Sequence, residues 1–206
     1  MSILVLTSDT LIATAAAGNI EYTSPIFAAT PIGTQRGIVP TQQYYRLDSV
    51  VVGSNATGAQ SIFGVGVTLS ASTVYEFEIF LLLIKTAGTT SHSVQVGFGG
   101  TATLNNIQWQ YNGTLSGAAT KIDSTYTTAY ATAATSLTLS PAAITAGLSF
   151  FGVIKGTVSI NAGGTFIPQY TLSAAPGGAY STQIGSYIRI NPLSASGAAT
   201  NVGTWA

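Results

Sequence analysis

The strongest strand signal in the chain is Tyr75-Glu76-Phe77-Glu78-Ile79-Phe80-Leu81-Leu82-Leu83-Ile84. In its first half, large apolar side chains alternate with glutamates, which is the pattern of a half-buried β-strand. After this half both faces become apolar, because Phe80, Leu82 and Ile84 continue the glutamate face. Only one face of a strand in an antiparallel sandwich meets the core of its own domain, so we expect these three side chains to contact another subunit. The alternative is that a loop or a second sheet of the same chain covers them.

The same alternation recurs along the chain and predicts an all-β fold. Clear strand candidates are 63–69, 93–98, 150–160, 166–172 and 184–190, and weaker ones are 44–52, 104–111, 137–139 and 202–205. Turn signals stand between them, at Gly99-Gly100, Asn112-Gly113, Asn161-Ala162-Gly163-Gly164 and Pro176-Gly177-Gly178. The Asn-Gly pair is the strongest of these, because both residues accept positive φ. Helical patterns are confined to 11–17 and 129–134, each enough for one turn. Many short strands with glycine-rich turns indicate an antiparallel, jelly-roll-like β-sandwich.

Charge is the unusual feature of the composition. Asp, Glu, Lys and Arg make up 6% of the 206 residues and the net charge is zero, while 46% of the residues are apolar. Ordinary soluble domains have about 25% charged residues. A free monomer with so few charges would lack the repulsion that keeps proteins apart in solution. We therefore expect copies of the chain or partner proteins to cover much of its surface.

The length and the uniform composition indicate one domain. A β-sandwich commonly runs to about 200 residues without splitting, and no charged linker divides this chain. We expect a single all-β domain over 1–206, in which 1–40 could form an extended N-terminal arm or attachment segment.

Several classes of partner are disfavoured by the composition. The six basic residues are scattered and give no electrostatic footprint for nucleic acid. The chain has no cysteine, which excludes disulfides, thiolate metal sites and a cysteine nucleophile. Its longest apolar run, from Ile79 to Ile84, is far shorter than the roughly 20 residues of a membrane span. We expect no nucleic-acid partner and no membrane insertion.

Catalytic chemistry is poorly represented. His92 is the only histidine, and no nucleophile elbow accompanies it. Glu76 and Glu78 share a strand face with Cβ atoms roughly 6.5–7 Å apart, a spacing that glycoside hydrolases use between the carboxylates flanking a sugar. Nothing predicts a cleft lined with aromatic rings around them, so we interpret them as an acidic patch that pairs with Lys or Arg of a neighbouring subunit. The aspartates are isolated from one another, which argues against a calcium loop. We expect no catalytic residue, metal or cofactor.

Aromatic residues are the best candidates for contacts. The chain has ten tyrosines and two tryptophans, residues that offer rigid, amphipathic contact area at interfaces. Those that could contact a partner protein or a glycan are Tyr44, Tyr45, Trp109, Tyr111 and Trp205. The alternative for each of them is ordinary packing in the core or between strands.

Short segments in a shared order along nearly the whole chain resemble a known family. They are LIATAAAGNIEY at 11–22, RGIVP at 36–40, NATGAQSIFGVGV at 55–67, GTATL at 100–104, KGTV at 155–158 and NVGTW at 201–205. The chain is similar to virion proteins of tailed phages that infect aquatic bacteria, including cyanobacteria, in which this unit often ends a long tail fibre. The resemblance implies a virion structural role and a trimeric β-sandwich, and it supplies no catalytic residue.

The chain begins almost directly with this unit, without an adaptor or a repetitive shaft, which favours a protein that sits on a capsid. We therefore expect a homotrimeric capsid decoration (cement) protein that contacts the phage major capsid protein. The alternative is a tail-fibre or receptor-binding head that contacts tail proteins and a host surface glycan. In both cases we expect the protein on the virion surface after assembly in the cytoplasm of the host bacterium. Other assemblies and a free lectin are further alternatives.

Overall fold

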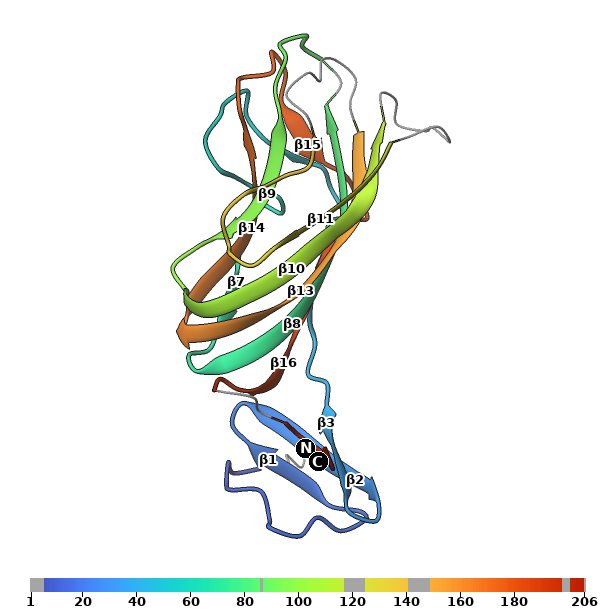
Figure 1. Ribbon diagram of the computed structural model, residues 1–206, viewed down its shortest axis with the longest axis vertical. Coiled ribbons are helices and arrows are strands. Elements are labelled where there is room, and N and C mark those ends of the chain that lie inside the picture. The colour runs from blue at the N-terminus through green and yellow to red at the C-terminus, as the bar shows by residue number, and fades with distance from the viewer. Residues whose placement is uncertain (1–5, 86, 117–124, 141–148, 198–200, 206) are drawn as a thin grey trace.

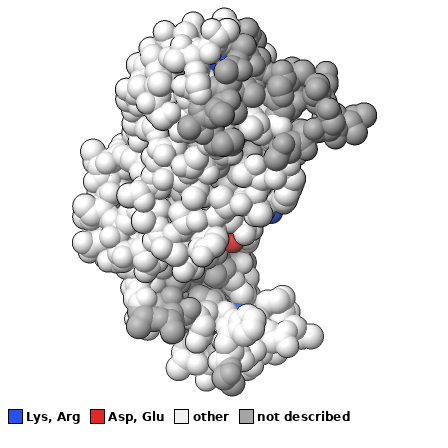
Figure 2. Space-filling model, turned by 45° about the horizontal axis from the view of Figure 1, so that its top comes forward, with Lys and Arg blue, Asp and Glu red and all other residues white. Residues whose placement is uncertain are grey.

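The structure is a computed structural model that describes residues 6–85, 87–116, 125–140, 149–197 and 201–205. In these residues it is entirely β, with no helix, and the strands form three sheets of eight, five and three strands in which every pairing is antiparallel. The two larger sheets pack as a sandwich, and the smallest lies beyond one end of it (Figure 1). The face of the molecule in Figure 2 is almost free of charged residues. The all-β sandwich is confirmed, whereas the jelly-roll connectivity and the trimer stay predictions.

The eight-stranded sheet contains the longest strands. In spatial order these are β11 (Thr125–Ala131), β10 (Thr103–Ser116), β13 (Ser149–Ala162) and β8 (Thr73–Lys85). Two pairs of strands extend the sheet from the edge of β8 opposite to β13. Strands β15 (Tyr180–Thr182) and β5 (Val51–Val52) follow its Lys85 end, and β16 (Tyr187–Ala195) and β4 (Gln43–Arg46) follow its Thr73 end.

The five-stranded sheet covers the inner face of the larger one. Its strands are β12 (Leu137–Thr138), β9 (Val94–Gly99), β14 (Gly164–Leu172), β6 (Gln60–Ser61) and β7 (Val67–Leu69). Alternate residues of both sheets meet in one buried cluster. Within it, the ring of Phe98 stacks on Phe166 with centroids 4.7 Å apart and is perpendicular to Trp109 at 5.2 Å. The predicted alternation of strands 75–84 and 93–98 therefore positions the core.

Two glycines of β13 make room for large rings in this core. Gly156 lies in register between Trp109 and Phe77, and a Cβ atom there would lie 2.6 Å from Cβ of Trp109 and 2.8 Å from Cζ of Phe77. Gly152 lies against Tyr111 in the same way, because a Cβ atom would be 2.6 Å from Cε2 of that ring. The rings fill the volume that the two missing side chains leave.

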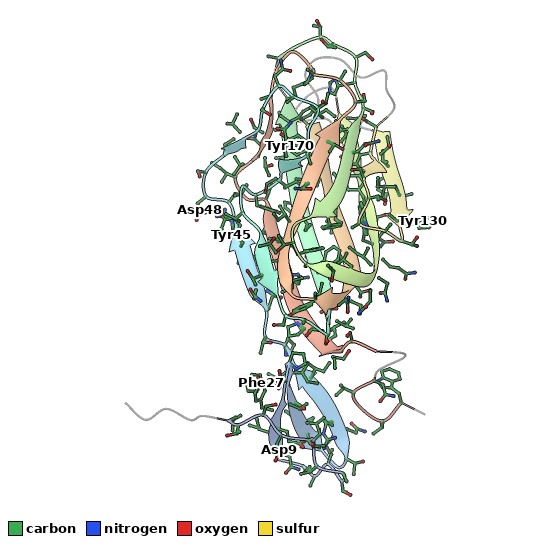
Figure 3. All side chains as sticks on the ribbon, turned by 90° about the vertical axis from the view of Figure 1, so that its left-hand side faces the viewer. Asp9, Phe27, Tyr45, Asp48, Tyr130 and Tyr170 are labelled. Atoms are coloured by element: carbon green, nitrogen blue, oxygen red, sulfur yellow. The ribbon has the colours of Figure 1, made fainter. Side chains whose placement is uncertain are left out.

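The three-stranded sheet accounts for much of the segment expected as an arm. It consists of β1 (Ile20–Thr23), β2 (Ile26–Ile32) and β3 (Gln35–Val39). Phe27 and Asp9 mark this end of the molecule in Figure 3. Ile26 and Ala28 are buried here, outside the cluster of the sandwich. An attachment role for this segment stays a prediction.

An ion pair fixes the residues before β1 to this sheet. Nε of Arg36 lies 2.9 Å from Oε2 of Glu21. The Arg36 guanidinium also donates to the Ile12 carbonyl at 2.7 Å, and the Ile12 N–H donates to Oε1 of Glu21 at 2.9 Å. Both charged side chains are mostly buried, with 16% and 12% of their surfaces exposed.

The strongest predicted turn is wrong. Asn112 and Gly113 lie inside β10, paired with β11 on one side and β13 on the other. The side-chain carbonyl of Asn112 accepts a hydrogen bond from the Thr128 hydroxyl at 2.9 Å. Because two neighbouring strands satisfy the backbone here, the local preference of Asn-Gly for a turn does not prevail.

Other differences have local causes. Only Val67–Leu69 of the strand predicted over 63–69 forms, since Gly64 adopts a φ of 72°. Gly185, at a φ of 90°, delays the strand predicted from 184 until Tyr187. The segment 11–17 forms no helix, Thr125–Ala131 takes up part of the other predicted helix as a strand, and 202–205 forms no strand. In the described part of the chain, no helix is long and apolar enough to cross a membrane.

Candidate functional site on the outer face of the large sheet

The outer face of the large sheet, which points away from the core, contains an apolar patch. Its members come from three adjacent strands and are Phe80, Leu82, Ile84, Phe151, Val153 and Tyr187. Register places Phe80 beside Val153 and Tyr187, and Leu82 beside Phe151. The ring of Phe80 stacks on Tyr187 with centroids 5.5 Å apart and meets the edge of Phe151 at 5.0 Å. The sheet thus gathers six apolar and aromatic side chains from three strands that are far apart in sequence.

The patch is only partly covered. Phe151 is 45% exposed, and Phe80, Leu82 and Ile84 are half-buried. The five-stranded sheet packs against the opposite face, so it does not cover them. Contact of these three residues with another subunit stays a prediction.

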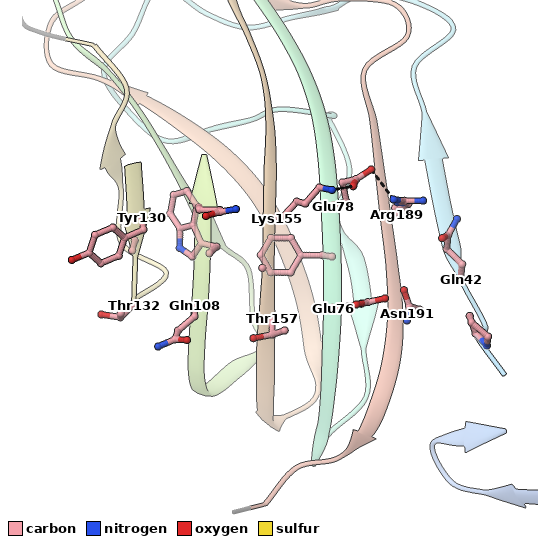
Figure 4. A pocket seen from close by; sticks show the side chains of 16 residues that line it. Gln42, Glu76, Glu78, Gln108, Tyr130, Thr132, Lys155, Thr157, Arg189 and Asn191 are labelled. Carbon is pink, nitrogen blue, oxygen red and sulfur yellow. Dashed lines mark ion pairs between the residues drawn. The ribbon is translucent and has the colours of Figure 1, made fainter. Parts of the chain in front are cut away.

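A polar groove of about 780 Å³ adjoins the patch on the same face. It crosses the large sheet, with Tyr130 and Thr132 at one end and Gln42 at the other (Figure 4). Most of the residues that line it have polar or charged side chains, and one exposed aromatic ring is among them: Gln42, Glu76, Glu78, Gln108, Gln110, Tyr130, Thr132, Lys155, Thr157, Arg189 and Asn191. The apolar part of the lining comes from Pro40, Phe77, Trp109, Ala131 and Gly156.

Glu78 is the most strongly bound side chain of the groove. Its carboxylate lies 2.8 Å from Nζ of Lys155 and 3.0 Å from Nη2 of Arg189, and it accepts a hydrogen bond from the Tyr187 hydroxyl at 2.8 Å. Burial of the carboxyl opposes ionisation, but the bonds from Lys155, Tyr187 and Arg189 outweigh it and hold the pKa of Glu78 at about 2. The cations expected from a neighbouring subunit are therefore supplied to Glu78 by its own chain.

Several other polar side chains of the groove have no hydrogen bond or ion pair among the described residues. Within the described residues, the amides of Gln42, Gln108 and Gln110 make no hydrogen bond, and Glu76 makes no ion pair. Tyr130 is 79% exposed. Such groups are available to a ligand.

Two of the aromatic residues expected as contacts are exposed on β4. Tyr44 lies on the outer face, 55% exposed, with its ring 5.5 Å from that of Tyr187. Tyr45 points to the other side, 43% exposed, and meets the ring of Phe63 edge-on at 6.2 Å. It lines a smaller hollow of about 380 Å³, and it lies on the opposite side of the sandwich from Tyr130 (Figure 3).

Trp109 and Tyr111 belong to the core instead. Trp109 is buried and donates from Nε1 to the Ala133 carbonyl at 2.9 Å, and Tyr111 is buried with its hydroxyl 3.3 Å from the Phe151 carbonyl. The ring of Tyr111 presents no surface to a partner, whereas Trp109, although only 3% exposed, lines the floor of the groove. Trp205, which is 79% exposed, lies near the small sheet, where Gly203 approaches the Arg36 carbonyl. The five expected contact residues do not form one site.

His92 has a hydrogen-bonding role in the interior of the molecule. It is buried, with Nδ1 2.7 Å from the Thr90 carbonyl and Nε2 2.8 Å from the Tyr180 hydroxyl. A carbonyl only accepts, so Nδ1 donates to Thr90 and Nε2 accepts from Tyr180. Burial lowers the pKa of His92, and the charge of Lys85 lowers it further. No cluster of acidic and histidine side chains suited to a metal occurs within the described residues.

The sequence did not single out Gln108, Gln110, Tyr130, Lys155 or Arg189. Their outward positions could be read from alternation in most of the predicted strands, but the strand order that brings them together could not. The position of Tyr130 was also missed, because the sequence predicted a helical turn over 129–134 where the structure has the end of β11.

Comparisons with known proteins add little. No family model and no curated protein matches the chain. Among solved structures, the chain is similar at 10% identity and a TM-score of 0.17 to one titled "Structure of infectious bursal disease virus Gx strain". The similarity covers 93% of this chain and 50% of the other, so the chain spans about half the length of that virus protein. A TM-score of this size carries neither fold nor function to this chain.

Proposed function

We propose that this protein is a non-enzymatic structural protein of the surface of a tailed-phage particle and that it works as a homotrimer. The observation that carries the proposal is the apolar patch, because Phe80, Leu82 and Ile84 lie on an outer face that its own core does not cover. The scarcity of charge, 6% of the chain, supports self-association in the same way. The assignment to a phage particle is supported by the sequence resemblance to virion proteins of tailed phages.

Burial of the patch against other copies would stabilise the assembly. Complete burial of a large apolar side chain contributes roughly 1.5–3 kcal/mol. Phe80 and Leu82 are already half-buried, so each gains only part of this. Phe151, at 45% exposed, has more surface to lose. Several such side chains together can hold subunits in contact.

The carboxylates support a non-enzymatic role. A general acid needs a pKa near the working pH, whereas the pKa of Glu78 is about 2 because Lys155 and Arg189 bind its carboxylate. Glu78 is therefore unsuited to donate the proton that sugar hydrolysis requires.

The location we favour is the capsid, where the protein would be a decoration protein in contact with the major capsid protein. The second candidate is a tail-fibre or receptor-binding head, and the open polar groove favours it, since a receptor needs an accessible site. In both cases the protein is on the virion surface.

Two experiments test the proposal. Light scattering of the purified chain should give the mass of three chains, and a stable monomer at micromolar concentration contradicts the assembly. Electron microscopy of the parent particle, labelled with an antibody to this protein, should show label over the head. Label at the tail selects the second candidate, and unlabelled particles contradict the virion role.

A further inference from the structure

We propose that the polar groove binds a neutral carbohydrate chain, which lies across the strands of the large sheet. The inference does not depend on the trimer or on the place of the protein in the particle. The patch and the groove use different side chains, and they meet between Phe80 and Glu78, two residues apart on β8.

The groove concentrates the few charges of the chain without a net charge. Six acidic and six basic residues occur in all 206 residues, and four of these twelve line the groove: Glu76, Glu78, Lys155 and Arg189. The two negative and two positive charges cancel. A site with no net charge has little preference for an anionic or a cationic ligand. Its chemistry therefore fits an uncharged, polar one.

The free amides suit hydroxyl groups. An amide side chain offers a carbonyl acceptor and two N–H donors, and a sugar hydroxyl can pair with either. Gln42, Gln108 and Gln110 line the groove with no hydrogen bond to another described residue. Together they offer three acceptors and six donors that no other described side chain occupies.

Tyr130 adds the apolar surface that a sugar ring needs. Its side chain stands at one end of the groove and is 79% exposed (Figure 4). Aromatic rings with a polar tip serve at sites where one part of a ligand is apolar and another is wet. The C–H face of a sugar ring can stack on this tyrosine while its hydroxyls bond to the amides.

The shape favours an extended chain of sugars. The groove crosses β11, β10, β13, β8 and β16, so with a strand spacing of about 4.8 Å it spans about 20 Å. Its floor is a hydrogen-bonded sheet, which limits the loss of freedom on binding.

A peptide fits less well. Extended peptides bind sheets by pairing their backbone with an edge strand. The groove lies on the face of the sheet, where Lys155 and Glu78 stand on strands whose backbones are already paired with each other. Side chains alone face the ligand there, and they match hydroxyls.

The test uses the full chain and an array printed with neutral and anionic bacterial polysaccharides, followed by calorimetry with the strongest binder. Neutral polysaccharides should bind, and Tyr130→Ala should weaken binding by at least about tenfold, as expected for loss of a stacking ring. The double variant Gln108→Ala, Gln110→Ala should weaken it as well. Tyr126→Ala is the matched control: Tyr126 shares the strand and the face, is 65% exposed and does not line the groove.

The proposal is overturned if no polysaccharide on the array binds, if only anionic ones bind, or if the two tyrosine variants lose binding equally. Binding of a peptide in the groove without any polysaccharide binding overturns it too. Light scattering on the same samples separates this result from the assembly. A trimer that binds no sugar contradicts the groove alone, and a monomer with binding that depends on Tyr130 contradicts the trimer alone.

Discussion

The hydroxyl of Tyr187 donates a hydrogen bond of 2.8 Å to the carboxylate of Glu78. The bond raises the pKa of Tyr187 and contributes to the low pKa of Glu78. The same tyrosine ring stacks on Phe80. One side chain therefore joins the apolar patch to the polar groove. A substitution in the patch should affect the side chains of the groove through Tyr187, and a substitution in the groove should affect the patch.

Glu78→Gln should lower the free energy of unfolding at neutral pH. The folded pKa of about 2 lies below the ordinary value of 4.5, so the ionised carboxylate stabilises the fold above that ordinary value. This contribution is lost as the pH falls through the folded pKa. Since Lys155 and Arg189 are about half exposed and screened by water, we expect a loss of about 1–2 kcal/mol. Urea unfolding of both proteins at neutral and acidic pH should show the difference shrink towards a pH of about 2.

Glu76→Gln is the control for this measurement. Glu76 is exposed on the same strand and makes no ion pair within the described residues. An equal loss in both variants would show that the Glu78 cluster is not the cause.

Leu82→Asp should dissociate the assembly and leave the fold intact. Leu82 is half-buried on the outer face, so water can reach a carboxylate there in a single chain. Buried between subunits, the same charge would have no partner and would be costly. Light scattering measures the mass and circular dichroism measures the fold. Thr157→Asp places a charge on the same face outside the patch and should keep the mass. An unchanged mass for Leu82→Asp places the interface elsewhere.

Gly156→Ala should destabilise the sandwich. The added methyl group would meet Cβ of Trp109, Cζ of Phe77 and the Gln108 carbonyl oxygen. The first and the last of these atoms cannot move without moving the backbone of β10. Overpacking of this kind costs about 1–3 kcal/mol. Thermal unfolding measures the loss. Gly37→Ala, which would have no atom within 4 Å of its new Cβ, should change stability far less.

The buried His92 should make stability fall in mild acid. Its folded pKa lies below the ordinary 6.5 because of burial, so the unfolded chain binds a proton more readily. Stability is therefore lost as the pH drops through the ordinary value toward the folded one. Urea midpoints between a pH of about 7.5 and about 5.5 should fall for the natural chain and change less for His92→Gln. Equal slopes would assign the pH dependence to other groups.

Much of the sandwich could be predicted from local patterns. Where a strand has one apolar face, as in Tyr75 to Ile79, the period of two indicates both the strand and its inward side. The prediction failed at Asn112-Gly113, where the pairing of β10 with two neighbours outweighs a strong turn preference. It also missed β11 and the small sheet, whose strands do not alternate clearly.

The candidate site was predicted only in part. The sequence placed Glu76 and Glu78 on one face, and this face does line the groove. Their partners Lys155 and Arg189 lie more than seventy residues further along the chain. Strand order and register bring them together, and neither can be derived from alternation within one strand. The same limit explains why Trp109 and Tyr111 were candidates for contact. Alternation along β10 predicted which residues share a face, but it did not indicate which of the two faces packs against the core.

The separation of Ile26 and Ala28 from the main cluster gives the molecule two cores of unequal size. Regions with few buried apolar contacts open at lower free energy than the rest of a protein. The amide protons of β2 should therefore exchange with solvent sooner than those of β8. If the molecule is anchored through this end, mechanical force should unfold the smaller sheet first, while the sandwich stays folded.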